Sequence, residues 1–507
     1  MTAVITAPAP AGARPAGPPS PRVTWGGILT ILVTTLVLTP VSVAVGGRMT
    51  LLAVAALVLV TVSYVHPPAA AYVVLVATPL TAGFSRSAFI PLLRPHEALA
   101  MVAGTGVALR ALAQLWTEHR LPLRFGRLDA VIVAMAGTSS LLPLLWMVAR
   151  GIPPNRDDLL YAGTIWKFYA LFLLVRASVR TERQVRRCLY LSIAAAAVMT
   201  VVAILQSMQI AGVPALVTAV YPIEGGGVAT PGRGSSTLGS PIAVGDVVAV
   251  SLAICLALLL CGQGRRTPLL VLAGLFTIGG IATGQFSGVI AIGIAVFVVA
   301  VVARRVKRLL IACVPVALAG LVVLRPVVQD RLAAVDSSTG LPHSWWVRLE
   351  NLRLYVWPEV FSGQNWLFGV RPLPVLRVDA PWASQIYIES GHTWLLWTGG
   401  VPFLLAYLIF IWVAARTVAV AARSRRDSVG AAATAALASL SVVFVLMTFD
   451  PHLTMRGGAD LLFSLLALAT AVPRQRRDAQ GEAAHTPDGR LPCSSTITFG
   501  TDHVRSP

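Results

Sequence analysis

Two ionisable side chains, Glu389 and His392, stand three residues apart in the stretch IYIESGHTWLLWTGGVPF, where a long apolar run begins. A neutral imidazole accepts a proton near pH 7, and a nearby carboxylate can orient the ring or take the proton itself. Ionisable groups at the edge of hydrocarbon are costly and are functional candidates by default. The pair is therefore a candidate site for proton transfer. The alternative is that His392 only caps a helix at the membrane interface.

Arginines precede this pair in the segment HSWWVRLENLRLYVWPEVF, residues 343–361. Its apolar residues recur at helical spacing, which predicts an amphipathic helix on the membrane surface, with Arg348 in a neighbouring stripe. The apolar positions are Trp345, Leu349, Leu352 and Val356. Because the planar guanidinium binds phosphate oxygens through paired hydrogen bonds, Arg348 and Arg353 are predicted to bind an anion. The alternative is an interfacial helix whose arginines only reach toward lipid headgroups.

Two further cations are candidates for the same anion. Arg233 stands among glycines and hydroxyl residues in PIEGGGVATPGRGSSTLGSPIAVG, residues 222–245, just before an apolar run. A Gly- and Ser-rich entry to a helix presents backbone N–H groups, which also favour phosphate. Lys167 in TIWKFYALF lies within an apolar stretch, where a cation is a functional candidate. The alternative for Lys167 is that it reaches to the interface from the end of its helix.

Composition shows where these side chains must be held. Hydrophobic residues make up 56% of the 507 positions and charged residues 12%, with a mean hydropathy of +0.76. Such a chain is predicted to be an all-α polytopic membrane protein. The net charge of +19 is therefore interpreted against a membrane, and no nucleic-acid partner is expected. The oligomeric state is left open.

Apolar stretches predict about fourteen transmembrane helices, with a range of about twelve to fourteen. They lie near 26–46, 50–65, 68–84, 97–115, 128–149, 160–176, 188–209, 241–261, 268–283, 286–303, 309–324, 391–415, 429–449 and 459–472. The pair at 268–303 is either two spans or a re-entrant segment. With both termini in the cytoplasm, the dense basic clusters all fall on the cytoplasmic side, as the positive-inside rule requires. These clusters are at 120–127, 176–187, 265–266, 304–308, 416–426 and 474–477.

This topology divides the chain into five parts. Residues 1–24 and 474–507 are predicted to be disordered cytoplasmic termini, because they are polar or rich in Pro and Ala. Residues 25–324 carry the first eleven spans, and residues 391–473 carry the last three. Between them, residues 325–390 form a long extracytoplasmic loop that contains the amphipathic helix and is predicted to be catalytic. Connections of this length are usually functional or disordered, and this one is rich in Trp and Tyr.

Three stretches, in order, resemble the O-antigen ligase and polysaccharide polymerase superfamily of bacterial membrane glycosyltransferases. They are GRGSSTLGSPIAVGDVVA (232–249), RLENLRLYVWPEVFSGQNWLFGVRP (348–372) and ESGHTWLLWTGGVPFLLAYL (389–408). Two positions depart from the family pattern, because Ile242 stands where an Asn is usual and TGQFSG (283–288) replaces a Ser-Arg. These departures indicate a different glycan or acceptor.

The resemblance implies a metal-independent, inverting transfer at the outer face of the cytoplasmic membrane, without a cofactor. The donor would be a glycan on undecaprenyl pyrophosphate, and the acceptor a glycan, lipid or protein. Arg233 and Arg348 would match the pyrophosphate-binding arginines, and His392 the histidine that handles the acceptor hydroxyl. Ligase and polymerase activities stay open. The rival function is a transporter or a flippase for lipid-linked oligosaccharides, which would be expected to show internal repeats or charges deep in several spans.

Overall fold

The computed structural model describes most of the chain between residues 50 and 471. The described ranges are 50–86, 93–119, 125–210, 212–221, 232–304, 343–380 and 383–471, with Gly47 and isolated residues between 311 and 333. The predicted spans 26–46 and, for the most part, 309–324 lie outside the described residues, as do the two predicted tails. The disorder expected for residues 1–24 and 474–507 therefore stays a prediction.

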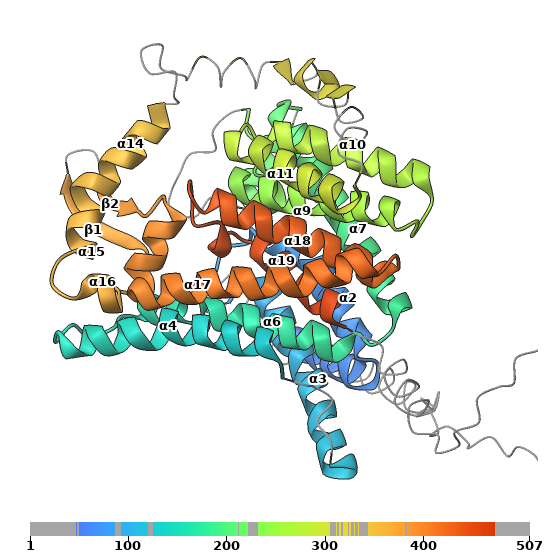
Figure 1. The fold of residues 1–507 in the computed structure, drawn as a ribbon, viewed down its shortest axis with the longest axis horizontal. Helices are drawn as coiled ribbons and strands as arrows, with labels where there is room; N and C mark the ends of the chain where they lie inside the picture. Colours follow the sequence, from blue (N-terminus) through green and yellow to red (C-terminus); the bar gives the residue numbers. More distant parts are fainter. Residues whose placement is uncertain are drawn as a thin grey trace, which may run out of the picture.

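Within the described residues the fold is almost entirely helical (Figure 1). Seven helices are long and apolar enough to cross a membrane: α3 (Pro95–Glu118), α4 (Arg127–Ala149), α5 with α6 (Arg156–Ala162 and Thr164–Ser178), α7 (Glu182–Ser207), α9 (Pro241–Leu260), α17 (Gly391–Ser424) and α18 (Ser428–Leu446). Five apolar helices are shorter: Thr50–Val65, α2 (Pro68–Thr81), α10 (Arg266–Ala282), α11 (Phe286–Val302) and α19 (Gly458–Thr470). The chain is thus a helical protein with the architecture of a multi-pass membrane protein.

These helices coincide with the predicted spans wherever the structure describes the chain. The segment 268–303, for which two alternatives were open, forms two separate helices, α10 and α11, joined by Thr283, Gly284 and Gln285. Their length of 17 residues each is short for a full crossing, which needs about 20 residues. The number of spans therefore remains a prediction, whereas the helical and apolar character of the segments is confirmed.

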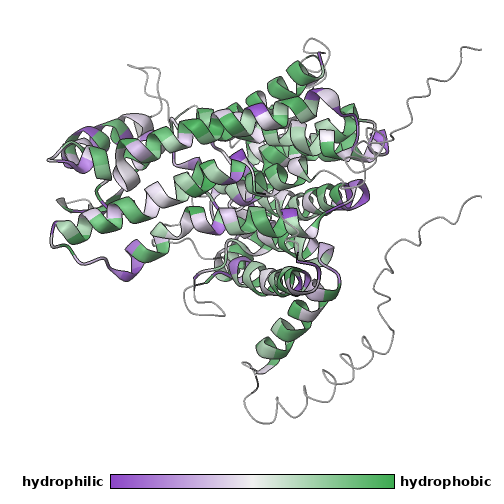
Figure 2. Ribbon diagram, turned by 60° about the horizontal axis from the view of Figure 1, so that its bottom comes forward, coloured by the Kyte–Doolittle hydropathy of each residue, from purple (hydrophilic) through white to green (hydrophobic). Residues whose placement is uncertain are grey.

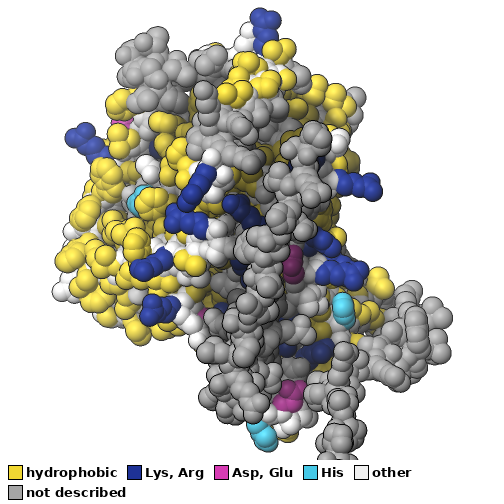
Figure 3. All heavy atoms as spheres, turned by 45° about the vertical axis from the view of Figure 1, so that its right-hand side comes forward, with side chains coloured by type: hydrophobic (Ala, Val, Ile, Leu, Met, Phe, Trp, Pro, Cys, Tyr) yellow, Lys and Arg dark blue, Asp and Glu magenta, His cyan; other side chains and the backbone are white. Residues whose placement is uncertain are grey.

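Helices α9, α18 and α19 form the centre of the bundle. Helix α9 is buried along nearly its whole length and packs against α10, α11 and α18, while α19 packs against α18 and α6. Helix α17 lies against α4 and α18, and α3 projects from the bundle (Figure 1). Hydrophobic residues dominate the helices (Figure 2). Many large apolar side chains are exposed on the outer surface (Figure 3). Such a surface suits a lipid environment.

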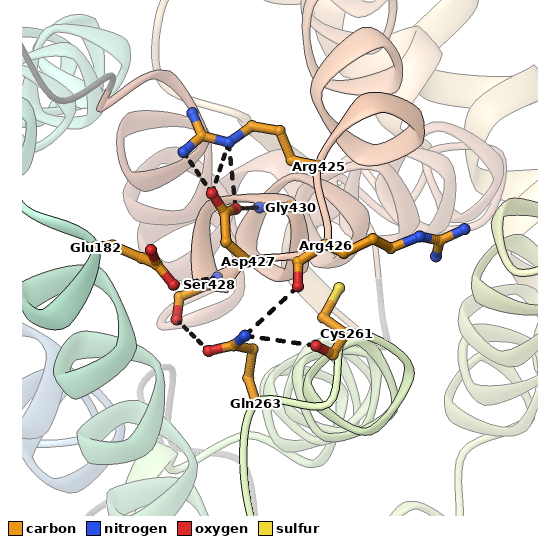
Figure 4. A network of polar contacts seen from close by, with 8 residues as sticks. All are labelled: Glu182, Cys261, Gln263, Arg425, Arg426, Asp427, Ser428 and Gly430. Carbon is orange, nitrogen blue, oxygen red and sulfur yellow. Dashed lines mark hydrogen bonds and ion pairs between the residues drawn. The ribbon is translucent and has the colours of Figure 1, made fainter. Parts of the chain in front are cut away.

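The two ends of the bundle carry different connections. At one end, Ser428 contacts Gln263 and Glu182, so that three segments predicted to lie on the cytoplasmic side meet (Figure 4). Arg176 pairs with Asp129, which joins two such segments. At the other end, Arg371 of the long loop pairs with Asp158, and Gly83 donates its N–H to the carbonyl of Thr237. Segments predicted to share a side of the membrane therefore do meet. Which end faces the cytoplasm stays a prediction.

The predicted surface helix at 343–361 is present as a continuous helical run. It comprises α14 (His343–Asn351), a π-helical turn η2 (Leu352–Val356) and α15 (Trp357–Val360). Leu352 and Val356 are buried as expected, but Leu349 is 45% exposed. Arg348 lies on the inward-facing side of the helix in place of Leu349, because two carboxylates there form ion pairs with it. The inward face therefore keeps Trp345, Leu352 and Val356 as predicted, and only Leu349 is replaced, by Arg348.

Two features of the long loop were not predicted. Strands β1 (Val375–Ala380) and β2 (Ala383–Tyr387) form an antiparallel hairpin between α16 (Asn365–Phe368) and α17. Helix α17 is broken at Gly399 and Gly400, and the loop fills the break: the N–H of Val370 donates to the carbonyl of Trp397 at 2.6 Å. A Cβ at Gly400 would lie 2.3 Å from the carbonyl oxygen of Leu367. Glycine is required there, both for this contact and for its positive φ of 65°.

Candidate functional site

The stretch Glu389–Ser390–Gly391–His392 is fixed against the connection between α18 and α19. Ser390 caps α17, since its hydroxyl accepts from the N–H of Thr393. The N–H of His392 donates to the carbonyl of Met447 at 3.2 Å. A Cβ at Gly391 would lie 2.5 Å from the Met447 sulfur, so only glycine permits this approach. The cap and the glycine together place His392 and Glu389 beside residues 447–457.

Arg348 lies at the centre of the polar cluster at this end. Its Nη1 donates to Oδ2 of Asp450 at 2.9 Å, and its Nε is 3.1 Å from Oε2 of Glu389. These three side chains come from α14, from the connection after α18 and from the residue pair before α17. Trp345, one turn earlier on α14, packs on Phe449 with ring centroids 5.0 Å apart. The aromatic contact fixes the helix that carries Arg348.

A buried histidine, His452, contacts the backbone of Asp450. The carbonyl of Asp450 accepts from the N–H of His452 at 2.7 Å. The His452 ring is 1% exposed, and its Nδ1 lies 2.8 and 2.9 Å from the two oxygens of Asp246 on α9. A carboxylate on one ring nitrogen fixes the orientation and tautomer of an imidazole. Asp246, His452, Asp450, Arg348 and Glu389 thus form one continuous chain of contacts.

Burial and charge act against each other within this chain. Burial raises the pKa of the Glu389 and Asp450 carboxyls above their usual range, although Arg348 offsets part of the effect. Burial lowers the pKa of His452, but the charge and hydrogen bond of Asp246 together with the charge of Asp450 outweigh it, so the pKa of this imidazole is raised overall. Groups perturbed in this way cluster at functional sites, and they also occur in structural ion-pair networks.

Arg233 lies close enough to Arg348 for the two charges to repel each other. Burial, and then the charge of Arg348, lower the pKa of Arg233. The glycine- and serine-rich segment itself does not offer its N–H groups as predicted. The N–H groups of Ser235 and Ser236 donate to Oε1 of Gln206 on α7, at 2.9 and 2.8 Å. The prediction was wrong for these two groups, because a buried amide oxygen already binds them.

The remaining two candidates lie away from Arg348. Nζ of Lys167 is 3.0 Å from Oε1 of Glu97 at the start of α3 and lies over the ring of Phe168. The cation reaches a carboxylate at the end of its span. Arg353 points outward from η2 and is exposed, without a polar partner of its own among the described residues. The structure therefore brings Arg233, Arg348 and Glu389 together and leaves Lys167 and Arg353 apart. His392 follows Glu389 by three residues, and its backbone N–H contacts Met447.

Asp450 was not a candidate from the sequence; His452 was only a weaker candidate, and Asp246 was considered only as a charge within a span. The signal was present: DPHLTMRGGAD, residues 450–460, places several ionisable residues between two apolar helices. What the sequence does not reveal is that this short connection meets a helix that lies about a hundred positions earlier. Chemically, the cluster offers cations for an anion, and carboxylates and an imidazole that can accept a proton.

Among the residues that the structure describes, no group of three or more His, Cys, Asp or Glu side chains is arranged to hold a metal ion. In comparisons with known proteins, no family model matches the chain and no curated protein does. The class of protein that fold and site define is therefore a multi-pass helical membrane protein with a compact cluster of arginines and carboxylates at one end of its bundle.

Proposed function

We propose that this protein is a membrane glycosyltransferase of the O-antigen ligase and polysaccharide polymerase kind. It would transfer a glycan from undecaprenyl pyrophosphate to an acceptor hydroxyl at the outer face of the cytoplasmic membrane. Polymerase and ligase differ only in whether the acceptor is another lipid-linked glycan or a different glycan, lipid or protein. In this proposal the Arg348 end of the bundle faces outward, and both termini lie in the cytoplasm.

The chemistry requires one bond to form and one to break. The acceptor oxygen attacks the anomeric carbon from the face opposite the pyrophosphate, and the bond from this carbon to the pyrophosphate oxygen breaks with inversion. The electron pair leaves with the pyrophosphate, and the hydroxyl proton passes to a base. Fixed cations beside the leaving oxygen stabilise the charge that develops there. Arg348 and Arg233 would supply this charge, and His392 would accept the proton.

One observation carries the proposal: Arg348 is held between carboxylates of two distant segments, and Arg233, from a third segment, lies within electrostatic reach of it. Bringing two cations together, with one of them partly buried, costs free energy unless an anion binds between or beside them. Arg233 comes from the connection before α9 and Arg348 from α14, and each lies in a stretch that carries the family resemblance. A diphosphate headgroup has the charge and the oxygen geometry that such a pair favours.

The rival function, a transporter or flippase, is less well supported by the placement of charges. A translocation path would need polar or charged groups along the spans. In the described helices, Lys167 and Asp246 have their partners, Glu97 and His452, at the Arg348 end of the bundle, and Asp129 pairs with Arg176 near the other end. These pairs therefore lie near the two ends of the bundle. A site at one face needs no charged groups between the ends, whereas a translocation path does.

The experiment is a transfer assay with full-length protein in lipid vesicles. The donor is an undecaprenyl-pyrophosphate glycan, and the measurement is the release of undecaprenyl pyrophosphate together with the elongated or transferred glycan. Arg348→Ala is expected to lower the rate about 10²- to 10³-fold, the usual loss for one group that stabilises transition-state charge. His392→Ala should lower the rate as well, by about 10²-fold or more, while donor binding persists.

Arg377→Ala is the matched control, because Arg377 is an exposed arginine of β1 in the same loop. Its rate should equal that of the wild type. Normal turnover by Arg348→Ala would remove the pyrophosphate assignment. Movement of the intact donor between leaflets, without release of the carrier, would replace the transferase by a flippase.

A further inference from the structure

Arg348 is held by two carboxylates that differ in how firmly they are fixed. Asp450 is 6% exposed and Glu389 is 41% exposed. The backbone of Asp450 is bonded on both sides, since its N–H donates to Leu446 and its carbonyl accepts from His452. Glu389 lies in the short coil between β2 and α17, and among the described residues Arg348 is the only polar partner of its side chain. Asp450 is therefore a fixed partner and Glu389 a replaceable one.

The edge of the guanidinium that each carboxylate uses is also different. Phosphate and carboxylate groups bind arginine most strongly through two parallel hydrogen bonds from adjacent N–H groups, as at the Nε–Nη2 edge. Arg371, in the same loop, shows this edge filled: Nε and Nη2 donate to the two oxygens of Asp158, at 2.9 and 2.7 Å. In Arg348, Asp450 binds Nη1 and Glu389 binds only Nε, so Nη2 has no partner of its own among the described residues.

An arriving diphosphate would meet this half-filled edge. It carries more negative charge than one carboxylate, and it offers two oxygens to Nε and Nη2 where Glu389 offers one. The nearby Arg233 adds attraction for an anion that Glu389, with its single charge, satisfies only in part. The buried Asp450 would meanwhile hold the guanidinium in place from Nη1. The arrangement favours exchange of one anion for another at an arginine that does not move.

We propose that Glu389 is an exchangeable counter-ion of Arg348, which a diphosphate group displaces from Nε while Asp450 keeps Nη1. The proposal rests on the proposed function and names the device by which the same site receives its donor. No covalent bond changes in this step. The Glu389 carboxylate, three residues before His392, is released beside the acceptor side of the site. An empty site thus keeps its arginine neutralised, and binding of the donor frees a carboxylate.

Titration of full-length protein in detergent with inorganic pyrophosphate, followed by calorimetry at constant salt, tests the proposal. Glu389→Gln removes the competing charge and is expected to bind pyrophosphate up to about fivefold tighter than the wild type, the upper end for an exposed ion pair. Glu389→Ala should bind tighter as well. Asp450→Asn should bind more weakly, because Arg348 loses the partner that positions it. These opposite signs distinguish exchange from a general loss of negative charge.

Glu350→Gln is the matched control, since Glu350 is an exposed residue of α14 two positions after Arg348. It removes one charge without touching the ion pair and should leave the affinity within about twofold, as expected for a surface substitution. An unchanged or weaker affinity of both Glu389 variants, with folding shown by thermal unfolding, would overturn the exchange and leave the proposed function standing. If pyrophosphate binds neither the wild type nor any variant, or if Arg348→Ala binds it as tightly as the wild type, both the exchange and the proposed function are overturned.

Discussion

Arg371 and Arg348 belong to the same loop at the same end of the bundle, yet their surroundings differ. Both oxygens of Asp158 fill the Nε–Nη2 edge of Arg371. Asp158 is itself 0% exposed and also accepts from the N–H of Asn155, the N-cap residue of α5. Arg348 divides its contacts between a buried and an exposed carboxylate and lies near Arg233. The comparison teaches that a cluster of arginines does not by itself indicate anion binding. What matters is whether the guanidinium edge is already filled.

The region around Arg371 is also tied to the break in α17. The adjacent Val370 donates to Trp397 and accepts from Arg150, whose Nη2 lies 2.5 Å from its carbonyl oxygen. Gly369 packs directly on the backbone of Thr398. This half of the loop is therefore part of the scaffold. The half that carries Arg348 meets the bundle through the buried Leu352 and Val356, the Trp345–Phe449 contact and the ion pairs of Arg348.

The largest effect is expected from breaking the scaffold pair. Arg371→Ala leaves the carboxylate of Asp158 buried without its cation, which typically costs about 3–5 kcal/mol of folding free energy. Thermal unfolding in detergent should show a markedly lower midpoint, and protease should cut the loop faster. The exposed Arg377→Ala control should unfold like the wild type. If Arg371→Ala is as stable as that control but loses pyrophosphate binding, the assigned roles of Arg371 and Arg348 are reversed.

The fold was largely predictable because apolar stretches of span length are a strong signal. Each helix that the structure describes as apolar coincides with a predicted span, including the pair at 268–303. The break in α17 was not predictable, although Gly399, Gly400 and Pro402 stand in the sequence. Glycine and proline are tolerated in membrane helices, so their presence alone does not say that a loop inserts there.

The site was predictable in part for the same reason. Arg348, Arg233 and Glu389 were found because charged groups are rare beside apolar runs. Their partner Asp450 was missed, since no local pattern connects a carboxylate after α18 with a helix before α17. In the segment predicted to offer backbone N–H groups to phosphate, those of Ser235 and Ser236 donate instead to Gln206 on another helix. Pairings between distant segments are a property of packing, and local sequence does not encode them.

A smaller, pH-dependent effect should sharpen the comparison at the Arg348 side. The groups facing His452 are Asp246, Asp450 and Arg348; burial lowers its pKa, but Asp246 and Asp450 together raise it overall. Folding therefore favours protonated His452. The resulting stability is fully present below the unfolded pKa of about 6.5 and is lost as pH rises through the higher folded value. The stability advantage of wild type over His452→Gln should shrink as the pH rises from about 6 to above the folded pKa.

Thermal unfolding of both proteins across this pH range measures the difference. His66→Gln is the control, because His66 is an exposed histidine in the turn before α2 and faces none of these groups. If the stabilities of the wild type and His452→Gln change in parallel with pH, the pKa of His452 does not differ between the folded and unfolded protein. The site would then lose the buried support assigned to Asp450, and Arg348 would resemble a surface arginine.

The smallest effect is expected at Arg353, five positions after Arg348 on the same helical run. The sequence analysis placed both arginines in the pyrophosphate site. In the structure Arg353 is exposed and, among the described residues, has no carboxylate partner, whereas Arg348 has two. If the carboxylates that hold Arg348 are what positions an arginine for an anion, Arg353→Ala should change turnover and pyrophosphate affinity by less than about twofold, as surface substitutions usually do. A loss comparable with that of Arg348→Ala would show that proximity to the membrane surface, and not the contacts of the guanidinium, selects the arginines that bind the donor.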